Sequence, residues 1–373
     1  MMSLPERNDL AISRLARVFA DTTNSYKFYW LLAILDDLKE NDRSIISLSD
    51  LALRMVANVW YPLDYFKLSF GSQDGFKPIA DFVSARMTVD HSQKALPLFQ
   101  QVKTSLTTAE LATVQKMVDT RVRYVPYRFV RPLLADLIAV DDKGDNVKKG
   151  IIHLSNSLFT EEPARVLYRF VNDTIEISAV WKEYLQQHQA ILRGFTYWHL
   201  LRFLQKNNPT VVGLPDKLFK RSDRNFKQAE PFWKTYLQSH PALTCIYSGQ
   251  LITEQNISLD HFLPWSYVVH DQLWNIIPTP KSVNSAKNNA LPSETLYFEK
   301  YAQLQFDAFH FHATRGNSRL LADYFTLFGR NLDSLLKQPY DWFREGLERS
   351  VLPQLQTARN MGFAYPFIYN PVG

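Results

Sequence analysis

The backbone of residues 258–292, SLDHFLPWSYVVHDQLWNIIPTPKSVNSAKNNALP, is divided by prolines. Proline lacks a backbone N–H and has a fixed φ, so it ends strands and interrupts regular helices. Pro264 should therefore end a strand over residues 257–262, and Pro278 should end a second strand over residues 274–278. The segment predicts two short strands joined by an irregular loop.

A short helix should follow the second strand. Thr279 can cap this helix, with Pro280 at its first position. Asn284, Lys287 and Asn288 are then spaced i, i+3 and i+4, which places them on one helical face. A turn with Ser and Gly at its tip, within TCIYSGQLI at residues 244–252, should precede the first strand.

The polar residues of this segment suit metal-assisted cleavage of a phosphodiester bond. Asp260 and Asn284 offer hard oxygen ligands, which select Mg²⁺ or Mn²⁺ over zinc. His261 can take a proton from water near neutral pH. Asn275 can hold the loop by hydrogen bonds, and Lys287 can meet a phosphate oxygen. The alternative is structural: the Asp-His pair is hydrogen-bonded, and the asparagines serve the helix and the turns.

The order and spacing of these residues resemble the ββα-metal motif of HNH endonucleases, and especially the HNH domain of the RNA-guided Cas9 enzymes. The similarity covers about residues 243–292. It implies that Asp260 and Asn284 are metal ligands, that His261 is the general base, and that Asn275 fixes the loop that aims the base. It also implies Mg²⁺ or Mn²⁺ as the cofactor and DNA as the substrate.

The remaining chain is similar to bacterial proteins described only as HNH-domain proteins, some of which look like parts of anti-phage defence. The similarity lies in stretches such as SYKFYWLLAILD and WYPLDYFKLSFG, and it implies a defence-system sensor or motor protein as a partner. Many family members set paired cysteines around the hairpin. Here only Cys245 is present, with Ser248 at the partner position. We therefore expect no zinc, and a hairpin held by packing and hydrogen bonds.

Helical periodicity dominates the first 130 residues, so the expected fold class is mainly α with a small α+β part. Helices are expected at about residues 9–20, 25–40, 47–60, 78–87 and 107–121. Ser49 and Thr107 are the expected N-caps, and Pro62 should end the third helix. The expected domains are a helical regulatory or nucleic-acid-binding region (1–208), a basic helical connector (209–242), the nuclease core (243–292), and a C-terminal helical region packing on that core (293–373).

Two segments combine basic and aromatic residues. They are RVRYVPYRFVRP at residues 121–132 and KLFKRSDRNFK at residues 217–227. Arginine and aromatic rings suit phosphate contact and base stacking, and a formal charge of +5 favours a polyanionic partner without proving one. The alternative is a solvated face beside a buried aromatic edge. The expected nucleic-acid contacts are Lys217, Lys220, Arg221, Arg224, Lys227 and Lys281.

The sequence favours a metal-dependent DNA endonuclease and leaves two alternatives open. One is a nucleic-acid-binding effector with a vestigial site, and the other is an RNA-directed nuclease toxin. The longest apolar run, FYWLLAIL at residues 28–35, is far shorter than the roughly 20 residues of a membrane span. The first residues lack the basic start and apolar block of a signal peptide, so we expect a cytoplasmic protein. The oligomeric state stays open.

Overall fold

The computed structural model describes residues 4–90, 93–138, 145–219 and 224–370. The chain divides into two compact units, Met1–Pro209 and Thr210–Gly373, called unit 1 and unit 2 below. Helices predominate in both units, and the strands form only small antiparallel sheets. The expected fold class, mainly α with a small α+β part, is therefore confirmed.

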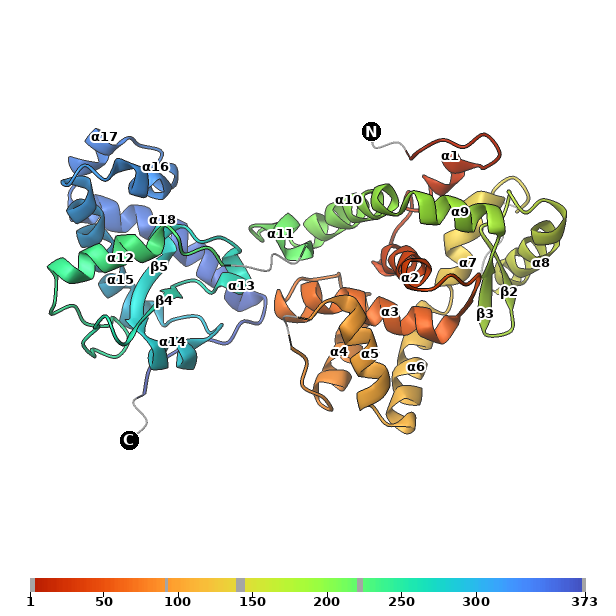
Figure 1. The fold of residues 1–373 in the computed structure, drawn as a ribbon, viewed down its shortest axis with the longest axis horizontal. Coiled ribbons are helices and arrows are strands. Elements are labelled where there is room, and N and C mark those ends of the chain that lie inside the picture. The colour runs from red at the N-terminus through yellow and green to blue at the C-terminus, as the bar shows by residue number, and fades with distance from the viewer. Residues whose placement is uncertain (1–3, 91–92, 139–144, 220–223, 371–373) are drawn as a thin grey trace. The chain divides into compact units, whose positions relative to one another are not determined.

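Unit 1 is a helical unit with one three-stranded sheet (Figure 1). The sheet has the order β1-β3-β2 and is antiparallel throughout. Its strands are β1 (Ile45–Ser47), β2 (Tyr168–Val171) and β3 (Thr174–Ile177). Its helices are α1 (Ile12–Leu15), α2 (Tyr26–Glu40), α3 (Leu48–Trp60), α4 (Phe76–Ser84), α5 (Ala95–Ser105), α6 (Thr108–Val122), α7 (Val125–Val130), α8 (Asp145–Glu161), α9 (Ala179–Gln187) and α10 (Gln189–Asn207).

The centre of unit 1 is α2, which carries the apolar run FYWLLAIL. All eight residues of that run are buried, because α3, α7, α9 and α10 pack around the helix. A helix that is apolar on every side must be covered on every side, either by protein or by lipid. Among the described residues, no helix has the length and apolar character needed to cross a membrane. Because neighbouring helices cover all eight of its residues, the run lies in the core of unit 1.

Helix caps in unit 1 match the sequence expectation at one site and differ at another. Thr107 caps α6 in a full capping box with Glu110, as expected. The expected cap Ser49 is wrong, because Ser47 caps α3 and accepts hydrogen bonds from the backbone N–H groups of Ser49 and Asp50. The β1 strand runs directly into this helix, so the cap is set by the end of the strand.

Two expected helix boundaries also shift. The helix expected over residues 9–20 is limited to Ile12–Leu15. Residues 181–209, WKEYLQQHQAILRGFTYWHLLRFLQKNNP, predict one helix that ends at Asn208 before Pro209. The structure instead divides this stretch into α9 and α10 at His188. The third helix ends at Trp60, before Pro62, as expected, and a π-helical turn at Tyr61–Tyr65 follows it directly.

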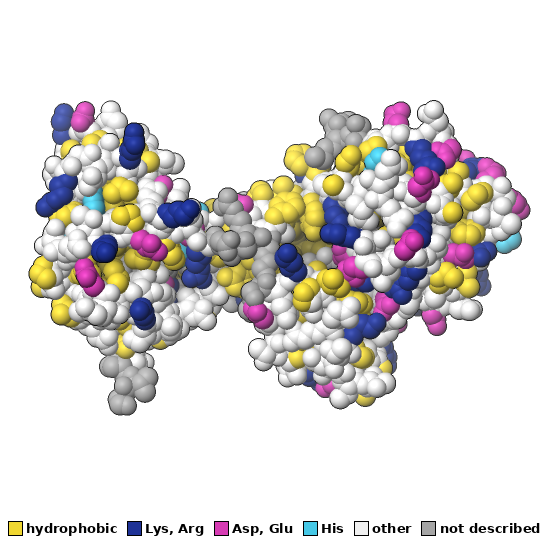
Figure 2. Space-filling view, viewed as in Figure 1, with side chains coloured by type: hydrophobic (Ala, Val, Ile, Leu, Met, Phe, Trp, Pro, Cys, Tyr) yellow, Lys and Arg dark blue, Asp and Glu magenta, His cyan; other side chains and the backbone are white. Residues whose placement is uncertain are grey.

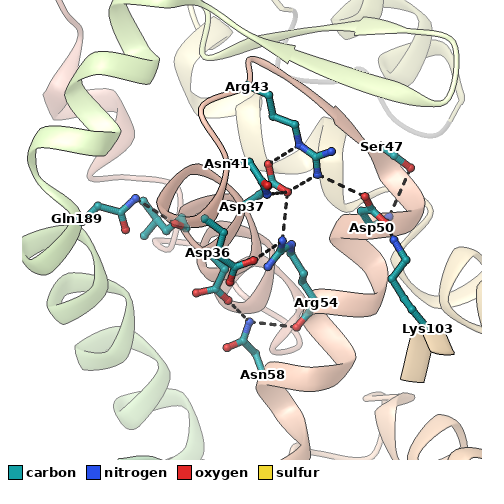
Figure 3. A network of polar contacts seen from close by, with 12 residues as sticks. Asp36, Asp37, Asn41, Arg43, Ser47, Asp50, Arg54, Asn58, Lys103 and Gln189 are labelled. Atoms are coloured by element: carbon teal, nitrogen blue, oxygen red, sulfur yellow. Dashed lines mark hydrogen bonds and ion pairs between the residues drawn. The ribbon is translucent and has the colours of Figure 1, made fainter. Parts of the chain in front are cut away.

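An ion-pair network joins α2 to the loop before β1, to α3 and to α5 (Figure 3). Asp37 is fully buried and forms ion pairs with Arg43 and with Arg54, the latter at 3.3 Å. Arg43 also contacts Asp50, which pairs with Lys103 of α5 at 2.8 Å. Removing one partner of a buried pair leaves the other charge uncompensated in a medium that solvates it poorly.

Asp37→Ala is expected to lower the free energy of unfolding of unit 1 by about 3–5 kcal/mol. The substitution leaves the buried Arg54 guanidinium without this carboxylate, although Glu40 still contacts it at 2.6 Å. Urea unfolding monitored by far-UV circular dichroism measures the loss. Asp42→Ala is the matched control, since Asp42 is 88% exposed and forms its ion pair with Lys182 at the surface. Equal unfolding midpoints for the two variants would contradict the assigned role.

Unit 2 surrounds a two-stranded antiparallel sheet with helices (Figure 1). The strands are β4 (Ile257–His261) and β5 (Ile276–Pro280). The helices are α11 (Leu214–Leu218), α12 (Ala229–Ser239), α13 (Trp265–Val268), α14 (Lys281–Lys287), α15 (Glu294–Ala313), α16 (Ala322–Phe328), α17 (Leu332–Leu336) and α18 (Tyr340–Asn360). One apolar core runs from α12 through the sheet to α15 and α18.

The second strand tolerates prolines that the sequence analysis expected to end it. It begins at Ile276 rather than at residue 274 and continues through Pro278 to Pro280. In an antiparallel ladder, hydrogen-bonded and non-bonded residue pairs alternate. The hydrogen bond from Lys281 N to Asn256 O (2.9 Å) shows which pairs between β4 and β5 are the hydrogen-bonded ones. Pro278 and Pro280 belong to the alternate, non-bonded pairs, so their nitrogens face away from β4 and no ladder bond is lost.

The start of α14 differs from the expectation as well. Pro280, and not Thr279, is the N-cap residue, and the helix begins at Lys281. Thr279 is the fourth residue of β5 and is buried, paired with Ser258. The order of strand, irregular loop, strand and helix is nevertheless the one that the prolines predict.

Candidate active site

The end of β4 and one face of α14 line a cavity of about 210 Å³, called the β4–α14 cavity below. Neighbouring strand residues normally point to opposite faces. Asp260 and His261 nevertheless both line this cavity, because they stand at the last two positions of β4, where the ladder gives way to a loop. Asn284 of α14 lines it as well. The structure therefore brings together three residues that the sequence analysis assigned to one site.

A carboxylate that the sequence analysis did not identify binds the histidine. The Nε2 atom of His261 lies 2.9 Å from Oδ1 of Asp271. Asp271 is held in place by the backbone N–H of Asn225, which donates to its Oδ2 at 2.8 Å. A carboxylate accepts hydrogen bonds, so Nε2 carries the proton and Nδ1 carries the lone pair. No hydrogen bond joins this Nδ1 to any residue that the structure describes.

The surroundings keep His261 neutral. Its side chain is only 3% exposed. Burial lowers the pKa of His261 below 6.5, and the opposing effect of Asp271 does not reverse this. Burial alone would raise the pKa of Asp271, but the hydrogen bonds from His261 and from the Asn225 backbone bring it below 3.8. The pair is thus a neutral imidazole oriented by an ionised carboxylate, which is a suitable arrangement for a general base.

Asp260 has two buried partners. Its Oδ2 accepts a hydrogen bond from the Tyr247 hydroxyl (3.1 Å), and its Oδ1 accepts one from the Lys287 ammonium (3.1 Å). The carboxylate itself is 4% exposed. An ionised carboxylate offers about four acceptor positions, so these two bonds leave capacity for a further ligand on the cavity side.

The position of Lys287 differs from the one expected for a residue that contacts a phosphate. Its ammonium is buried and donates to Asp260 and to the carbonyl oxygen of His261 (2.7 Å). Burial lowers the pKa of Lys287, and the Asp260 charge opposes this shift. The expectation that Lys287 meets a phosphate oxygen does not fit this position, because its ammonium is buried and is bonded to Asp260 and to the His261 carbonyl oxygen. Its contacts instead fix the last two residues of β4.

Asn284 presents an oxygen to the cavity. Its side-chain nitrogen Nδ2 donates to Ser258 Oγ (2.8 Å) and to the Leu259 carbonyl oxygen (3.1 Å). A carbonyl only accepts, so the atom facing Leu259 is the amide nitrogen, and Oδ1 is the remaining acceptor. These bonds tie α14 to β4 and set the direction of Oδ1.

Asn275 clamps the loop that follows His261. Its Oδ1 accepts a hydrogen bond from the Leu263 N–H (2.8 Å), and its Nδ2 donates to the Leu263 carbonyl oxygen (2.9 Å). Its own carbonyl oxygen accepts from Phe262 N at 2.8 Å. Asn275 is fully buried, so these three bonds are protected from water. The geometry matches a residue that holds a loop rather than one that contacts a substrate.

The donor set of the cavity fits a hard divalent cation better than zinc. Asp260 and Asn284 both present oxygen, and Mg²⁺ and Mn²⁺ prefer oxygen ligands with several positions left for water and phosphate. Among the residues that the structure describes, no group of three or more His, Cys, Asp or Glu side chains could hold a metal ion. Any ion at this cavity would therefore rest on two protein ligands, as the resemblance to HNH nucleases implies.

The hairpin before β4 is held by backbone hydrogen bonds. Cys245 is buried, and its N–H donates to the Gln250 carbonyl oxygen at 2.8 Å. Gly249 donates back to the Cys245 carbonyl oxygen at 2.9 Å and has a φ of +71°, a conformation that favours glycine. The turn carries Tyr247 on its inner side, where it reaches Asp260. This turn therefore supports the candidate site directly.

The expected nucleic-acid contacts separate into four cases. Arg224 is exposed and lines the β4–α14 cavity. Lys227 and Lys281 are exposed but do not line it. Lys217 corrects the expectation, since its ammonium is buried and donates to the carbonyl oxygens of Val212 and Tyr267. Burial lowers the pKa of Lys217 to about 7, so it is not a surface cation. The remaining two, Lys220 and Arg221, lie outside the described residues.

Residues 245–293 match the model of the HNH endonuclease family. The matched segment begins at the supporting turn and ends just beyond α14, so it contains both ligand candidates, the histidine and the clamp. The segment belongs to the HNH endonucleases, which confirms the expected family and indicates nuclease activity on nucleic acid. No curated protein and no solved structure gave a significant match to the chain.

Proposed function

We propose that the chain is a metal-dependent endonuclease that hydrolyses phosphodiester bonds in DNA. The observation that carries the proposal is the convergence of Asp260, His261 and Asn284 on one cavity. The family match supports action on nucleic acid. The arrangement combines a neutral base with two oxygen ligands, and this combination suits hydrolysis of a phosphodiester.

In this mechanism His261 is the general base. Its Nδ1 takes a proton from the attacking water, while the Nε2–H bond to Asp271 holds the ring and stabilises the imidazolium that forms. Asn275 keeps the ring in position by clamping the loop that follows it. Since burial lowers the pKa of His261, the base is unprotonated at neutral pH without further activation.

Asp260 and Asn284 would hold Mg²⁺ or Mn²⁺ at the cavity. When bound, the ion supplies stabilisation of the charge that develops on the phosphate and on the leaving 3′ oxygen. The Tyr247 hydroxyl and the Lys287 ammonium orient the Asp260 carboxylate. The hydrogen bonds of Asn284 to β4 direct its Oδ1.

Nicking of supercoiled plasmid by the purified full chain tests the proposal. Nicked circles should form with Mg²⁺ or Mn²⁺ and should be absent with EDTA. A chain that binds plasmid but never nicks it would instead be a binding effector with a vestigial site. Preferential cleavage of RNA in competition with DNA would make it an RNA-directed nuclease. The resemblance to bacterial defence proteins supports a role as an anti-phage effector, acting with a sensor or motor protein.

Arg224→Ala should weaken binding of every DNA sequence about equally. Removing one phosphate contact should also reduce the slope of log affinity against log salt by about one unit. Fluorescence anisotropy with a labelled duplex over a range of salt concentrations measures both effects. Lys217→Met is the matched variant: because Lys217 is buried, its loss should leave the salt slope unchanged. An unchanged slope for Arg224→Ala would show that Arg224 is only a solvated residue.

A further inference from the structure

A second cavity, of about 740 Å³, lies within unit 1 and plays no part in the proposed nuclease site. It is lined by residues of the loop before α2, the start of α2, the end of α6, α7 and the 3₁₀ turn Arg131–Leu134. A cavity of this volume can hold a ligand of nucleotide size. We call it the basic cavity, for the side chains described next.

Positive charge is concentrated in the lining of the basic cavity. Among the described lining residues there are five cations and a single carboxylate: Arg17, Lys27, Arg121, Arg128 and Arg131 against Asp21. By contrast, Lys and Arg alternate with Asp and Glu over the face of unit 1 seen in Figure 2. No ion pair joins Arg17, Arg121 or Arg128 to an acidic side chain within the described part of the chain. A concave surface with an excess of one charge attracts a ligand of the opposite charge.

The surroundings of Lys27 show that several charges of the basic cavity lie close together. Its ammonium donates to the carbonyl oxygens of Val18 (3.1 Å) and Asp21 (2.8 Å), which folds the loop into one wall of the cavity. Burial lowers the pKa of Lys27. The nearby Asp21 opposes this, and the charges of Arg128 and Arg131 lower the pKa further. Three cations from two separate segments therefore influence the same small region.

An aromatic ring stands beside the cations. Tyr124 is half-buried and lines the cavity, and the Arg128 guanidinium carbon lies 5.3 Å from the centre of its ring. Arginine beside an aromatic face is suited to a ligand that joins phosphate to a planar base. The basic aromatic segment at residues 121–132, which the nuclease site does not use, thus has a place in the fold.

We propose that the basic cavity binds a small phosphate-bearing molecule of nucleotide size, with its phosphate oxygens on Arg17 and Arg128 and its base beside Tyr124. A polynucleotide is held in an open groove that follows its backbone. Here the cations instead line one cavity of about 740 Å³. Arginine also forms the bidentate hydrogen bonds that recognise phosphate groups.

Isothermal titration of the full chain, with EDTA present to keep metal from the nuclease site, tests this proposal with ATP, tripolyphosphate and adenosine as probes. ATP and tripolyphosphate should bind, and adenosine should not. The double variant Arg17→Gln/Arg128→Gln should bind ATP at least about 10-fold more weakly, since each lost charge-assisted hydrogen bond typically costs about 10- to 100-fold. Failure of both phosphate probes to bind the wild-type chain would overturn the proposal, whatever the behaviour of the variants.

Two controls locate the binding. Arg202→Gln removes an exposed arginine of α10 that does not line the cavity, and it should bind ATP like the wild type. Arg224→Gln should do the same, whereas a loss of ATP binding in this variant alone would place the ligand at the nuclease site and overturn the proposal. A single-stranded oligonucleotide that binds through Arg17 and Arg128 while ATP does not would also overturn it, because the occupant would then be a polynucleotide.

Discussion

His261→Ala is expected to reduce plasmid nicking by on the order of 10²- to 10⁴-fold, the usual cost of removing a general base. DNA binding should persist, since the substitution removes a neutral side chain and leaves Arg224 in place. The buried ring contacts Phe226 and Asp271, so some loss of stability is expected. The rate is therefore measured at a temperature where circular dichroism shows both proteins to be folded.

The matched control is His240→Ala. His240 is a partly buried histidine of the same unit that stacks on Tyr236 and lies outside the β4–α14 cavity. It should nick plasmid at the wild-type rate. Wild-type activity in His261→Ala, or an equal loss in both variants, would remove His261 from the mechanism.

The pH dependence of nicking follows from the same histidine. Its folded-state pKa lies below the ordinary value of 6.5, because burial disfavours the charged form. The active form is the unprotonated one, so the rate should rise with pH through a value below 6.5 and stay level above neutrality. A rate that falls between pH 6 and pH 8 would contradict this assignment.

The local plan of the site could be predicted because prolines and spacing constrain it strongly. A first strand that ends just before Pro264, the clamp Asn275 and the helix that carries Asn284 all follow from short-range rules on strands, turns and helix faces. Their convergence on one cavity is a consequence of the strand, loop, strand, helix order. The prediction that Thr279 caps the helix was wrong because β5 continues to Pro280. Its prolines stand at positions that make no backbone hydrogen bond to β4.

Other features depend on long-range packing, which periodicity does not report. Lys287 shares a helical face with Asn284, but only the fold shows that its end of α14 is covered and that its ammonium meets Asp260. The prediction that Lys217 contacts nucleic acid was wrong for the same reason. The sequence of a basic segment does not indicate which of its side chains is buried. Asp271 lies in VVHDQLW, where nothing in the local pattern marks its carboxylate as the partner of His261.

Asp260→Asn is expected to slow nicking at millimolar Mg²⁺ by on the order of 10²- to 10³-fold. Metal ions contribute several kcal/mol of charge stabilisation, and each 1.36 kcal/mol is tenfold in rate. Asparagine is chosen over alanine because it keeps the volume and can still accept from Lys287. Alanine would leave the buried Lys287 ammonium without a carboxylate partner, bonded to the His261 carbonyl oxygen. The resulting loss of stability would obscure the effect on metal binding.

Asn284→Ala provides the comparison, because it removes a neutral ligand where Asp260→Asn removes a charged one. The charged ligand contributes more to the affinity for a divalent cation, so Asp260→Asn should need far more metal or fail outright. Asn284→Ala should be partly rescued by Mn²⁺, which tolerates a less complete set of ligands. Titrating Mg²⁺ and Mn²⁺ against the nicking rate of both variants distinguishes these cases. If both variants kept the metal dependence of the wild-type chain, the ion would have to bind elsewhere, and the β4–α14 cavity would not be the catalytic centre.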